Sequence, residues 1–285
     1  MQSKPQFIHF IFLFIGAICI GWSAIFVKLA GVSGITSAFY RVLIASVVLF
    51  PIWIFSKNKF PDKQSLLLIS LGGFFFGMDL IFWNQSIFLS SAGFSTALAN
   101  FAPVWVALGS TIFFKHQLNK YFWLGTIVSI IGVLLGIGWE KINHLEIGLG
   151  NGFALIASFF YACYLLTTGI ARQKTDTLTF MTFATIACTI TLFFSTLILD
   201  ESFVVPQQSW LALLGLGLIT HVAGWLTINY ALGHIHSSIG SVLLLSQAIL
   251  TSLFAIPVLH EYLTSSQIIG GLIVLIGILI VILKR

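Results

Sequence analysis

Apolar residues along this chain fall into long, nearly continuous stretches that are separated by short polar segments. A helix needs about 20 residues to cross a bilayer, and each of these stretches is of that length. The stretches are residues 7–29, 35–55, 65–89, 95–114, 121–138, 148–170, 177–199, 209–232, 239–259 and 265–283. The pattern therefore predicts ten transmembrane segments.

These segments are expected to be helices. A backbone in lipid satisfies its hydrogen bonds either in an α-helix or in a closed β-barrel, and barrel strands are shorter and alternate between apolar and polar positions. The longest gaps between the stretches, residues 56–64, 139–147 and 200–208, leave no room for an extramembrane domain. The sequence therefore predicts an all-α integral membrane protein.

The composition agrees with this prediction and excludes a soluble protein. Hydrophobic residues make up 58% of the chain, and only 7% are charged, whereas soluble proteins have about 25%. The formal net charge of +5 is too sparse for a nucleic-acid surface. Cys19, Cys163 and Cys188 stand far apart and form no metal or redox motif. We therefore expect membrane lipid and a small molecule as partners, and no nucleic acid, metal or cofactor.

Lysine and arginine are distributed unevenly between the short loops. If the N-terminus is cytoplasmic, Lys141 is the only such residue in a loop on the outer side. Because cytoplasmic loops are enriched in Lys and Arg, we expect both termini in the cytoplasm and a multi-pass protein of the bacterial cytoplasmic (inner) membrane. The residues on the inner side are Lys4, Lys57, Lys59, Lys63, Lys115, Lys120, Arg172, Lys174, Lys284 and Arg285.

The sequence also contains an internal repeat. A displacement of 145 residues aligns identical residues across three spans without a gap, and a looser match at 138 residues covers the first span. We therefore predict two five-helix repeats, residues 1–138 and 139–285. Because five is odd, the second repeat is inverted in the membrane, which is typical of secondary transporters. The aligned pairs are Leu71 with Leu216, Gly72 with Gly217, Asn84 with Asn229, Leu118 with Leu263, Gly125 with Gly270 and Gly132 with Gly277.

Several short motifs resemble those of a known family. In the first half they are Phe39-Tyr40-Arg41, Gly77-Met78-Asp79-Leu80, Trp83-Asn84, Ser90-Ser91-Ala92-Gly93 and Asn100-Phe101-Ala102-Pro103-Val104. In the second half they are Gly224-Trp225, Asn229-Tyr230-Ala231-Leu232, Leu243-Leu244-Leu245, His260-Glu261-Tyr262-Leu263 and Gly270 to Gly277. Together they resemble EamA-type members of the drug/metabolite transporter superfamily over nearly the whole chain.

This resemblance implies a transporter of small metabolites with ten helices in a 5+5 arrangement. It implies in particular an exporter of amino acids or related compounds. The central cavity is then lined mainly by the first, third, fourth, sixth, eighth and ninth spans.

Three formal charges lie within the predicted spans, where charges are costly and rare. Lys28 ends its span, so it anchors the helix at the interface or takes part in function. Arg41 and Asp79 lie at depths that differ by only about 6 Å. Two interpretations stay open: Asp79 is a proton or substrate-ammonium site influenced by Arg41, or the two residues form a structural salt bridge.

Two stripes of polar and aromatic residues are expected to face the bundle. Asp79 and Trp83 are four residues apart, as are His221 and Trp225, and Asn229 follows one turn later. His221 either joins a proton relay near neutral pH or forms a hydrogen bond to a neighbouring helix.

Further candidates lie near the expected helix interruptions. Asn100 precedes Pro103, which removes a backbone donor at mid-span, and Ser246 and Gln247 occupy the corresponding region of the second half. The aromatic candidates either wall the cavity or pack. The full set of pathway candidates is Trp22, Asp79, Trp83, Asn84, Asn100, Tyr161, Tyr164, Trp225, Asn229, Ser246 and Gln247, and the ion-coupling candidates are Asp79, His221 and Arg41.

Glycines are frequent in the fifth and tenth spans, where they permit close helix packing. They are Gly125, Gly132, Gly136, Gly270, Gly271 and Gly277. We expect these spans to form a scaffold or a dimer surface and not the pathway. Monomer and homodimer stay open.

The resulting functional hypothesis is a secondary active transporter of a small metabolite that works by alternating access, in the direction of export and with proton coupling. An intramembrane channel or a structural membrane protein is the alternative. An intramembrane enzyme is less favoured, because the HExxH-like string that begins at His260 ends in Thr264 and neither a Gly-x-Ser-x-Gly motif nor a phosphate loop is present.

Overall fold

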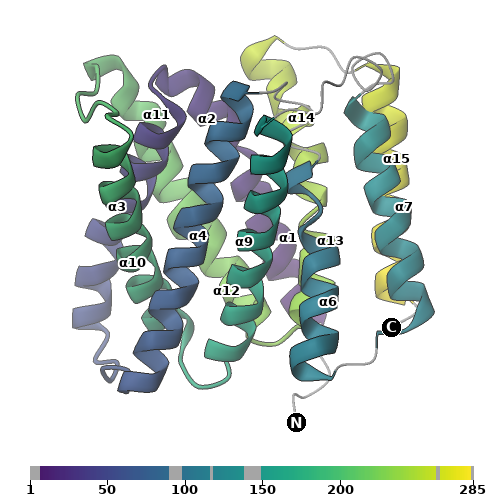
Figure 1. Ribbon diagram of the computed structural model, residues 1–285, viewed down its shortest axis with the longest axis horizontal. Helices are drawn as coiled ribbons and strands as arrows, with labels where there is room; N and C mark the ends of the chain where they lie inside the picture. The colour runs from purple at the N-terminus through teal and green to yellow at the C-terminus, as the bar shows by residue number, and fades with distance from the viewer. Residues whose placement is uncertain (1–6, 90–97, 116–117, 138–148, 261–263, 284–285) are drawn as a thin grey trace.

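The computed structural model describes residues 7–89, 98–115, 118–137, 149–260 and 264–283. Throughout this part of the chain, all regular elements are helices, and most stand side by side as a bundle (Figure 1). Residues 90–93 and 261–263, which contribute to the family resemblance, and residues 95–97 of the fourth predicted span lie outside the described residues. The same holds for Lys4, Lys141, Lys284 and Arg285.

The helices follow the predicted spans closely. In the first half they are α1 (Phe7–Gly21), α2 (Ser23–Ala30), α3 (Gly34–Phe55), α4 (Lys63–Leu89), α6 (Ala102–Phe114) and α7 (Lys120–Ile137). In the second half they are α9 (Leu149–Ala171), α10 (Thr177–Ile198), the 3-10 turn η1 (Gln207–Ser209), α11 (Trp210–Leu214), the π-helical η2 (Gly215–Trp225), α12 (Leu226–Leu232), α13 (Ser237–Leu243), α14 (Ser246–Leu259) and α15 (Ser265–Leu283).

Eight helical segments in the described residues are long and apolar enough to cross a membrane, so the protein is a multi-pass integral membrane protein. Two further apolar helices, Ala102–Phe113 and Lys120–Gly136, are shorter and correspond to the fourth and fifth predicted spans. The eight segments are Phe7–Ala30, Gly34–Phe55, Lys63–Ser86, Leu149–Ala171, Thr177–Ile198, Gln207–Leu232, Ser237–Val258 and Ser265–Leu283.

Side-chain caps define where several helices begin. Ser33 accepts a hydrogen bond from the backbone N–H of Thr36 at the start of α3 (3.1 Å), and Asp176 caps α10 in the same way. Ahead of α4, Asp62 Oδ1 accepts from Ser65 N at 2.7 Å. These bonds satisfy backbone donors that have no partner inside the helix.

The eighth predicted span differs from a regular α-helix. The segment from Gly215 to Trp225 is a π-helix, in which each backbone bond spans one residue more than in an α-helix. Such segments are uncommon and occur often at functional sites. This one carries His221 and Trp225.

Three of the predicted spans are interrupted. The first is broken at Trp22, between α1 and α2, and the ninth at residues 244–245, between α13 and α14. In the fourth span, residues 100–101 form a turn and α6 begins at Ala102. Pro103 therefore occupies the first turn of α6, where proline is well tolerated, and the start of this helix lies in the middle of the fourth predicted span.

Contacts between the helices place α4 and α9, the third and sixth predicted spans, at the centre of the bundle. Helix α4 packs against α9 and α10, and α3 packs against α10 and η2. Helix α1 packs against α12, η2 and α14, while α6 packs against α9 and α13. Large apolar side chains such as Phe7, Phe55 and Leu211 are exposed, as expected for a surface that faces lipid.

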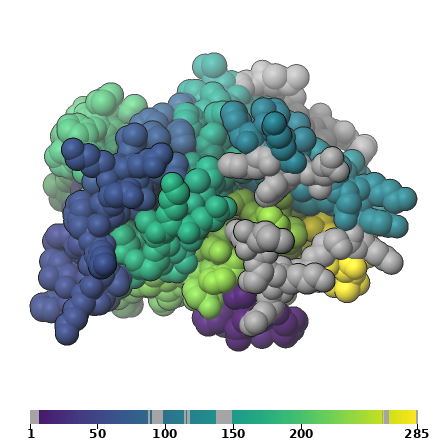
Figure 2. Space-filling view, turned by 90° about the horizontal axis from the view of Figure 1, so that it is seen from below, coloured from purple at the N-terminus to yellow at the C-terminus, as the bar shows by residue number. Residues whose placement is uncertain are grey.

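Helices α7 and α15 form a separate pair at one end of the molecule (Figures 1 and 2). A methyl group on Gly125 would lie 2.5 Å from the carbonyl oxygen of Gly277, and one on Gly132 would lie 2.7 Å from that of Gly270. The two helices therefore run antiparallel with their backbones in contact. Their small residues have the packing role expected from the sequence.

Candidate functional site

A cluster of aromatic rings occupies the centre of the bundle. Phe76 of α4 stacks on Tyr164 of α9, with ring centroids 4.7 Å apart, and meets the edge of Trp225 at 4.8 Å. The ring of His221 lies 5.8 Å from Phe76, and Tyr161 lies 6.1 Å from Trp225. These five residues, which we call the aromatic centre, join α4, α9 and η2.

Asn229 connects this centre to α10. Its side-chain nitrogen donates to the hydroxyl of Tyr164 at 2.9 Å and to the carbonyl of Trp225 at 2.8 Å, and it lies 2.9 Å from Met181 Sδ. The structure thus brings together Tyr164, Trp225 and Asn229, all of which are pathway candidates.

His221 is fully enclosed in the bundle. Its Nε2 shares a hydrogen bond of 3.1 Å with the hydroxyl of Thr185 on α10, whereas its buried Nδ1 has no partner. The hydrogen bond to a neighbouring helix, one of the two alternatives for this residue, is therefore present. The second ring nitrogen stays free for another contact.

Three residues of the aromatic centre carry a buried polar atom that has no hydrogen-bond partner among the described residues, and further such atoms lie elsewhere in the bundle. Besides His221 Nδ1, they include the hydroxyl of Tyr161, Nε1 of Trp225 and Nε of Arg41. Buried polar groups are nearly always hydrogen-bonded, so each exception calls for a physical reason. A bound polar molecule or ordered water at the centre of the bundle would satisfy these atoms.

Arg41 and Asp79 belong to α3 and α4. Arg41 is 7% exposed and donates from Nη1 to Ser23 Oγ at 3.1 Å, while Asp79 is partly buried. Both residues lie within membrane-spanning segments. However, no salt bridge within 4.0 Å joins these two described residues, so the interpretation as a direct structural ion pair is not supported.

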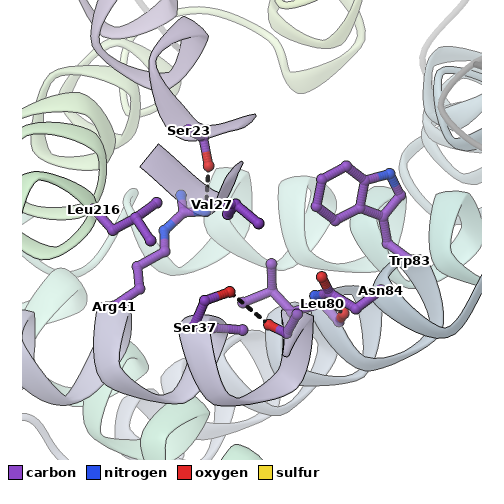
Figure 3. A pocket seen from close by; sticks show the side chains of 10 residues that line it. Ser23, Val27, Ser37, Arg41, Leu80, Trp83, Asn84 and Leu216 are labelled. Carbon is purple, nitrogen blue, oxygen red and sulfur yellow. Dashed lines mark hydrogen bonds between the residues drawn. The ribbon is translucent and has the colours of Figure 1, made fainter. Parts of the chain in front are cut away.

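A small pocket opens beside Arg41 (Figure 3). It leaves about 10 Å³ for a water-sized molecule and is partly open. Of the sequence candidates, Arg41, Trp83 and Asn84 line it, and Asn84 donates to the carbonyl of Leu80 at 2.6 Å. Ser23 and Ser37, which sequence reasoning missed, also line it. The complete lining is Ser23, Val27, Gly34, Ser37, Ala38, Arg41, Leu80, Trp83, Asn84 and Leu216.

The remaining pathway candidates lie at the helix interruptions. Trp22 stacks on Phe254 of α14 at 4.8 Å, and Asn100 is buried just before α6. Ser246 donates to the carbonyl of Leu243 at 2.7 Å, and Gln247 follows it in α14. None of these candidates lines the pocket or contributes a ring to the aromatic centre.

Two residues of the site, Phe76 and Thr185, were not identified from the sequence. Phe76 precedes Asp79 by three residues and therefore shares its helix face, which is the signal that would have found it. Thr185 lies in a stretch rich in threonine on the seventh predicted span, and nothing in the sequence distinguishes it from its neighbours. In the described residues, no three metal-ligating side chains cluster.

Comparisons with known proteins agree with the fold and the resemblance. The EamA-like transporter family matches residues 8–137 and 148–283. The uncharacterized transporter YdfC of Bacillus subtilis is 26% identical over 269 residues, which cover 92% of this chain and 88% of that protein. An uncharacterized transporter of Archaeoglobus fulgidus is 26% identical over 270 residues, covering 93% and 95%.

A solved crystal structure shows the same fold, with a TM-score of 0.82 over 99% of this chain and 98% of that chain, at 16% sequence identity. The two matched segments together cover nearly the whole sequence. The chain therefore belongs to the EamA-like transporter family.

Proposed function

We propose that this protein is a secondary active transporter that exports a small metabolite, an amino acid or a related compound, by alternating access. The observation that carries the proposal is the set of unpartnered polar atoms around the aromatic centre, deep inside a bundle of membrane helices. Polar groups at this depth are costly, so they are retained where they serve a pathway.

The aromatic centre supports a small, partly apolar substrate. Its rings provide apolar area, and Tyr161 and Trp225 add a hydroxyl and an indole N–H that have no partner in the described part of the chain. Ligand sites of this kind combine an apolar lining with a few polar groups that fix orientation. A channel for ions would need no such lining.

Contacts between α7 and α15 support an inverted pair of repeats, residues 1–138 and 139–285. Gly125 contacts Gly277, and Gly132 contacts Gly270. Gly270 and Gly277 lie 145 positions after Gly125 and Gly132, so exchanging the two halves turns one contact into the other. Ser129 donates to the carbonyl of Val274, its own counterpart in the repeat, at 3.4 Å. Two halves related in this way can expose a central site alternately to each side.

The interruptions of the fourth and ninth spans support the same arrangement. Residues 100–101 and 244–245 form turns at positions 144 residues apart, within one residue of the repeat displacement. Broken helices at corresponding positions of two halves are characteristic of transporter substrate sites. We infer ten membrane spans with both termini in the cytoplasm of a bacterial cell, as the loop charges predict.

Proton coupling is the second part of the proposal. Asp79 is an ionisable group within the bundle, and His221 has one ring nitrogen without a partner. Carboxylates and histidines inside membrane bundles serve as proton relays. They are the two groups through which a pH gradient would act.

The test uses purified protein in liposomes. A labelled amino acid should enter with saturable kinetics, and the same unlabelled compound inside should accelerate its entry. A thermal-shift screen of metabolites on the detergent-solubilised protein would first identify compounds that stabilise it. Linear, non-saturating flux over a broad panel of compounds would instead identify a channel.

A further inference from the structure

Arg41 places a positive charge beside the pocket, inside the membrane bundle. It lines the pocket together with Ser23, Ser37 and Trp83, and its side chain is 7% exposed (Figure 3). A guanidinium has five N–H donors and stays protonated in proteins. The partners of these donors therefore determine what the pocket accepts.

The protein itself satisfies this guanidinium only in part. Nη1 donates to Ser23 Oγ at 3.1 Å, and the buried Nε has no hydrogen-bond partner. Among the described residues, none forms an ion pair with Arg41 within 4.0 Å. A buried cationic donor that lacks an acceptor is a binding group for an anion.

The surroundings favour a carboxylate over a multiply charged anion. The two oxygens of a carboxylate match the planar, two-pronged guanidinium. Arg41 carries a single positive charge, so a dianion such as phosphate would leave one negative charge buried without compensation. Ser23 accepts from Arg41, so its own hydroxyl proton stays available for a ligand oxygen.

We propose that Arg41 binds the carboxylate of the transported compound and restricts transport to compounds that carry one. This proposal rests on the proposed function and names its substrate class. The substrates are small compounds that carry a carboxylate.

The test uses exchange assays on liposomes that contain the full chain. Each free amino acid of the standard set is compared with its carboxamide and with its decarboxylated amine. Wild-type protein should exchange acids, while the amides and amines should be weaker by at least about tenfold, because a site built for a polar group rejects analogues that lack it. Arg41→Gln should lose this discrimination. Arg41→Lys should keep part of it, since the charge remains without the planar fork.

Lys28→Gln is the matched control. Lys28 lies in the last turn of α2 next to Val27, is exposed and does not line the pocket, so its loss changes the charge on the same part of the molecule. The ratio of acid to amide exchange should stay unchanged in this variant. A change as large as that of Arg41→Gln would show a general charge effect and contradict the role of Arg41.

The acid-to-amide comparison on wild-type protein tests the proposal even if Arg41→Gln does not fold. Equal exchange of acids, amides and amines would overturn the carboxylate requirement but leave the carrier function standing. If none of these compounds is exchanged or stabilises the protein, the carboxylate proposal and the assignment to amino-acid-like substrates both fail.

Discussion

Asn229 and Tyr164 exchange hydrogen bonds across the centre of the bundle. The amide nitrogen of Asn229 donates to the hydroxyl of Tyr164 at 2.9 Å, and that hydroxyl lies 3.2 Å from the amide oxygen. Both side chains are almost completely buried. This pair connects α12 to α9 and holds Trp225, one turn before Asn229, against Phe76.

Replacement of Asn229 by Ala should therefore destabilise the protein strongly. The change removes the donor to Tyr164 and leaves that hydroxyl short of a buried partner, which costs about 1–3 kcal/mol. Thermal unfolding of the detergent-solubilised protein measures the effect. Ser195→Ala is the control, because the hydroxyl of Ser195 donates to the carbonyl of Thr191 within its own helix. Equal shifts for the two variants would contradict a connecting role for Asn229.

The packing of α7 against α15 predicts opposite outcomes for two neighbouring glycines. A methyl group on Gly132 would lie 2.7 Å from backbone atoms of α15, whereas one on Gly136 would meet nothing within 4 Å. Gly132→Ala should lower stability by about 1–3 kcal/mol through overpacking. Gly136→Ala should leave stability unchanged or raise it, since alanine favours helix by about 1 kcal/mol. Thermal unfolding of both variants checks this contrast.

Asp79→Asn tests proton coupling. The variant keeps the size and hydrogen-bonding capacity of the side chain but cannot bind and release a proton. Transport driven by a pH gradient should fall at least about tenfold, in line with a lost coupling group, while exchange without a gradient should persist. Gradient-driven transport at the wild-type rate would show that Asp79 is not the coupling residue.

Asp62 predicts a pH-dependent contribution of the cap before α4. The hydrogen bonds from Ser65, led by its backbone N–H, lower the pKa of the Asp62 carboxyl. A carboxyl whose folded-state pKa is lowered stabilises the fold above its ordinary pKa of about 3.9, and the stabilisation is lost as pH falls through the lowered value. Asp62→Ala should thus reduce the unfolding temperature at neutral pH, and the difference from wild type should shrink in acid.

Asp62→Asn is the companion variant for this measurement. An asparagine keeps an acceptor oxygen for Ser65 but does not titrate in this range. It should retain much of the cap while removing its contribution to the pH dependence. A difference between wild type and Asp62→Ala that is constant with pH would contradict the ionic character of the cap.

The membrane architecture was largely readable from the sequence, because lipid imposes length and hydrophobicity on every span. Helices α3, α10 and α15 begin and end within two residues of the predicted limits. The glycines of α7 and α15 likewise predicted that these two helices pack closely. Such features depend on local composition and on spacing along one chain, both of which a single sequence displays.

The site was predictable only in part, since its geometry depends on contacts between distant helices. The candidates Arg41, Tyr164 and Trp225 were found because charged and polar aromatic residues stand out in a largely apolar sequence. Phe76 looked like any other apolar residue, and Thr185 like any other threonine. The π-helical segment around His221 also has no recognisable sequence signal, because it arises from backbone bonding and tertiary packing.

The glycine contacts between α7 and α15 also restrict motion. Gly125 and Gly132 are seven residues apart, as are Gly270 and Gly277, and a heptad spacing is that of a left-handed seam between two helices. Two backbone contacts at this spacing define a single register: if one helix slides or rotates on the other, both contacts are lost together. We therefore infer that the pair moves as one rigid unit, so that the alternating access proposed above would take place in the remaining helices.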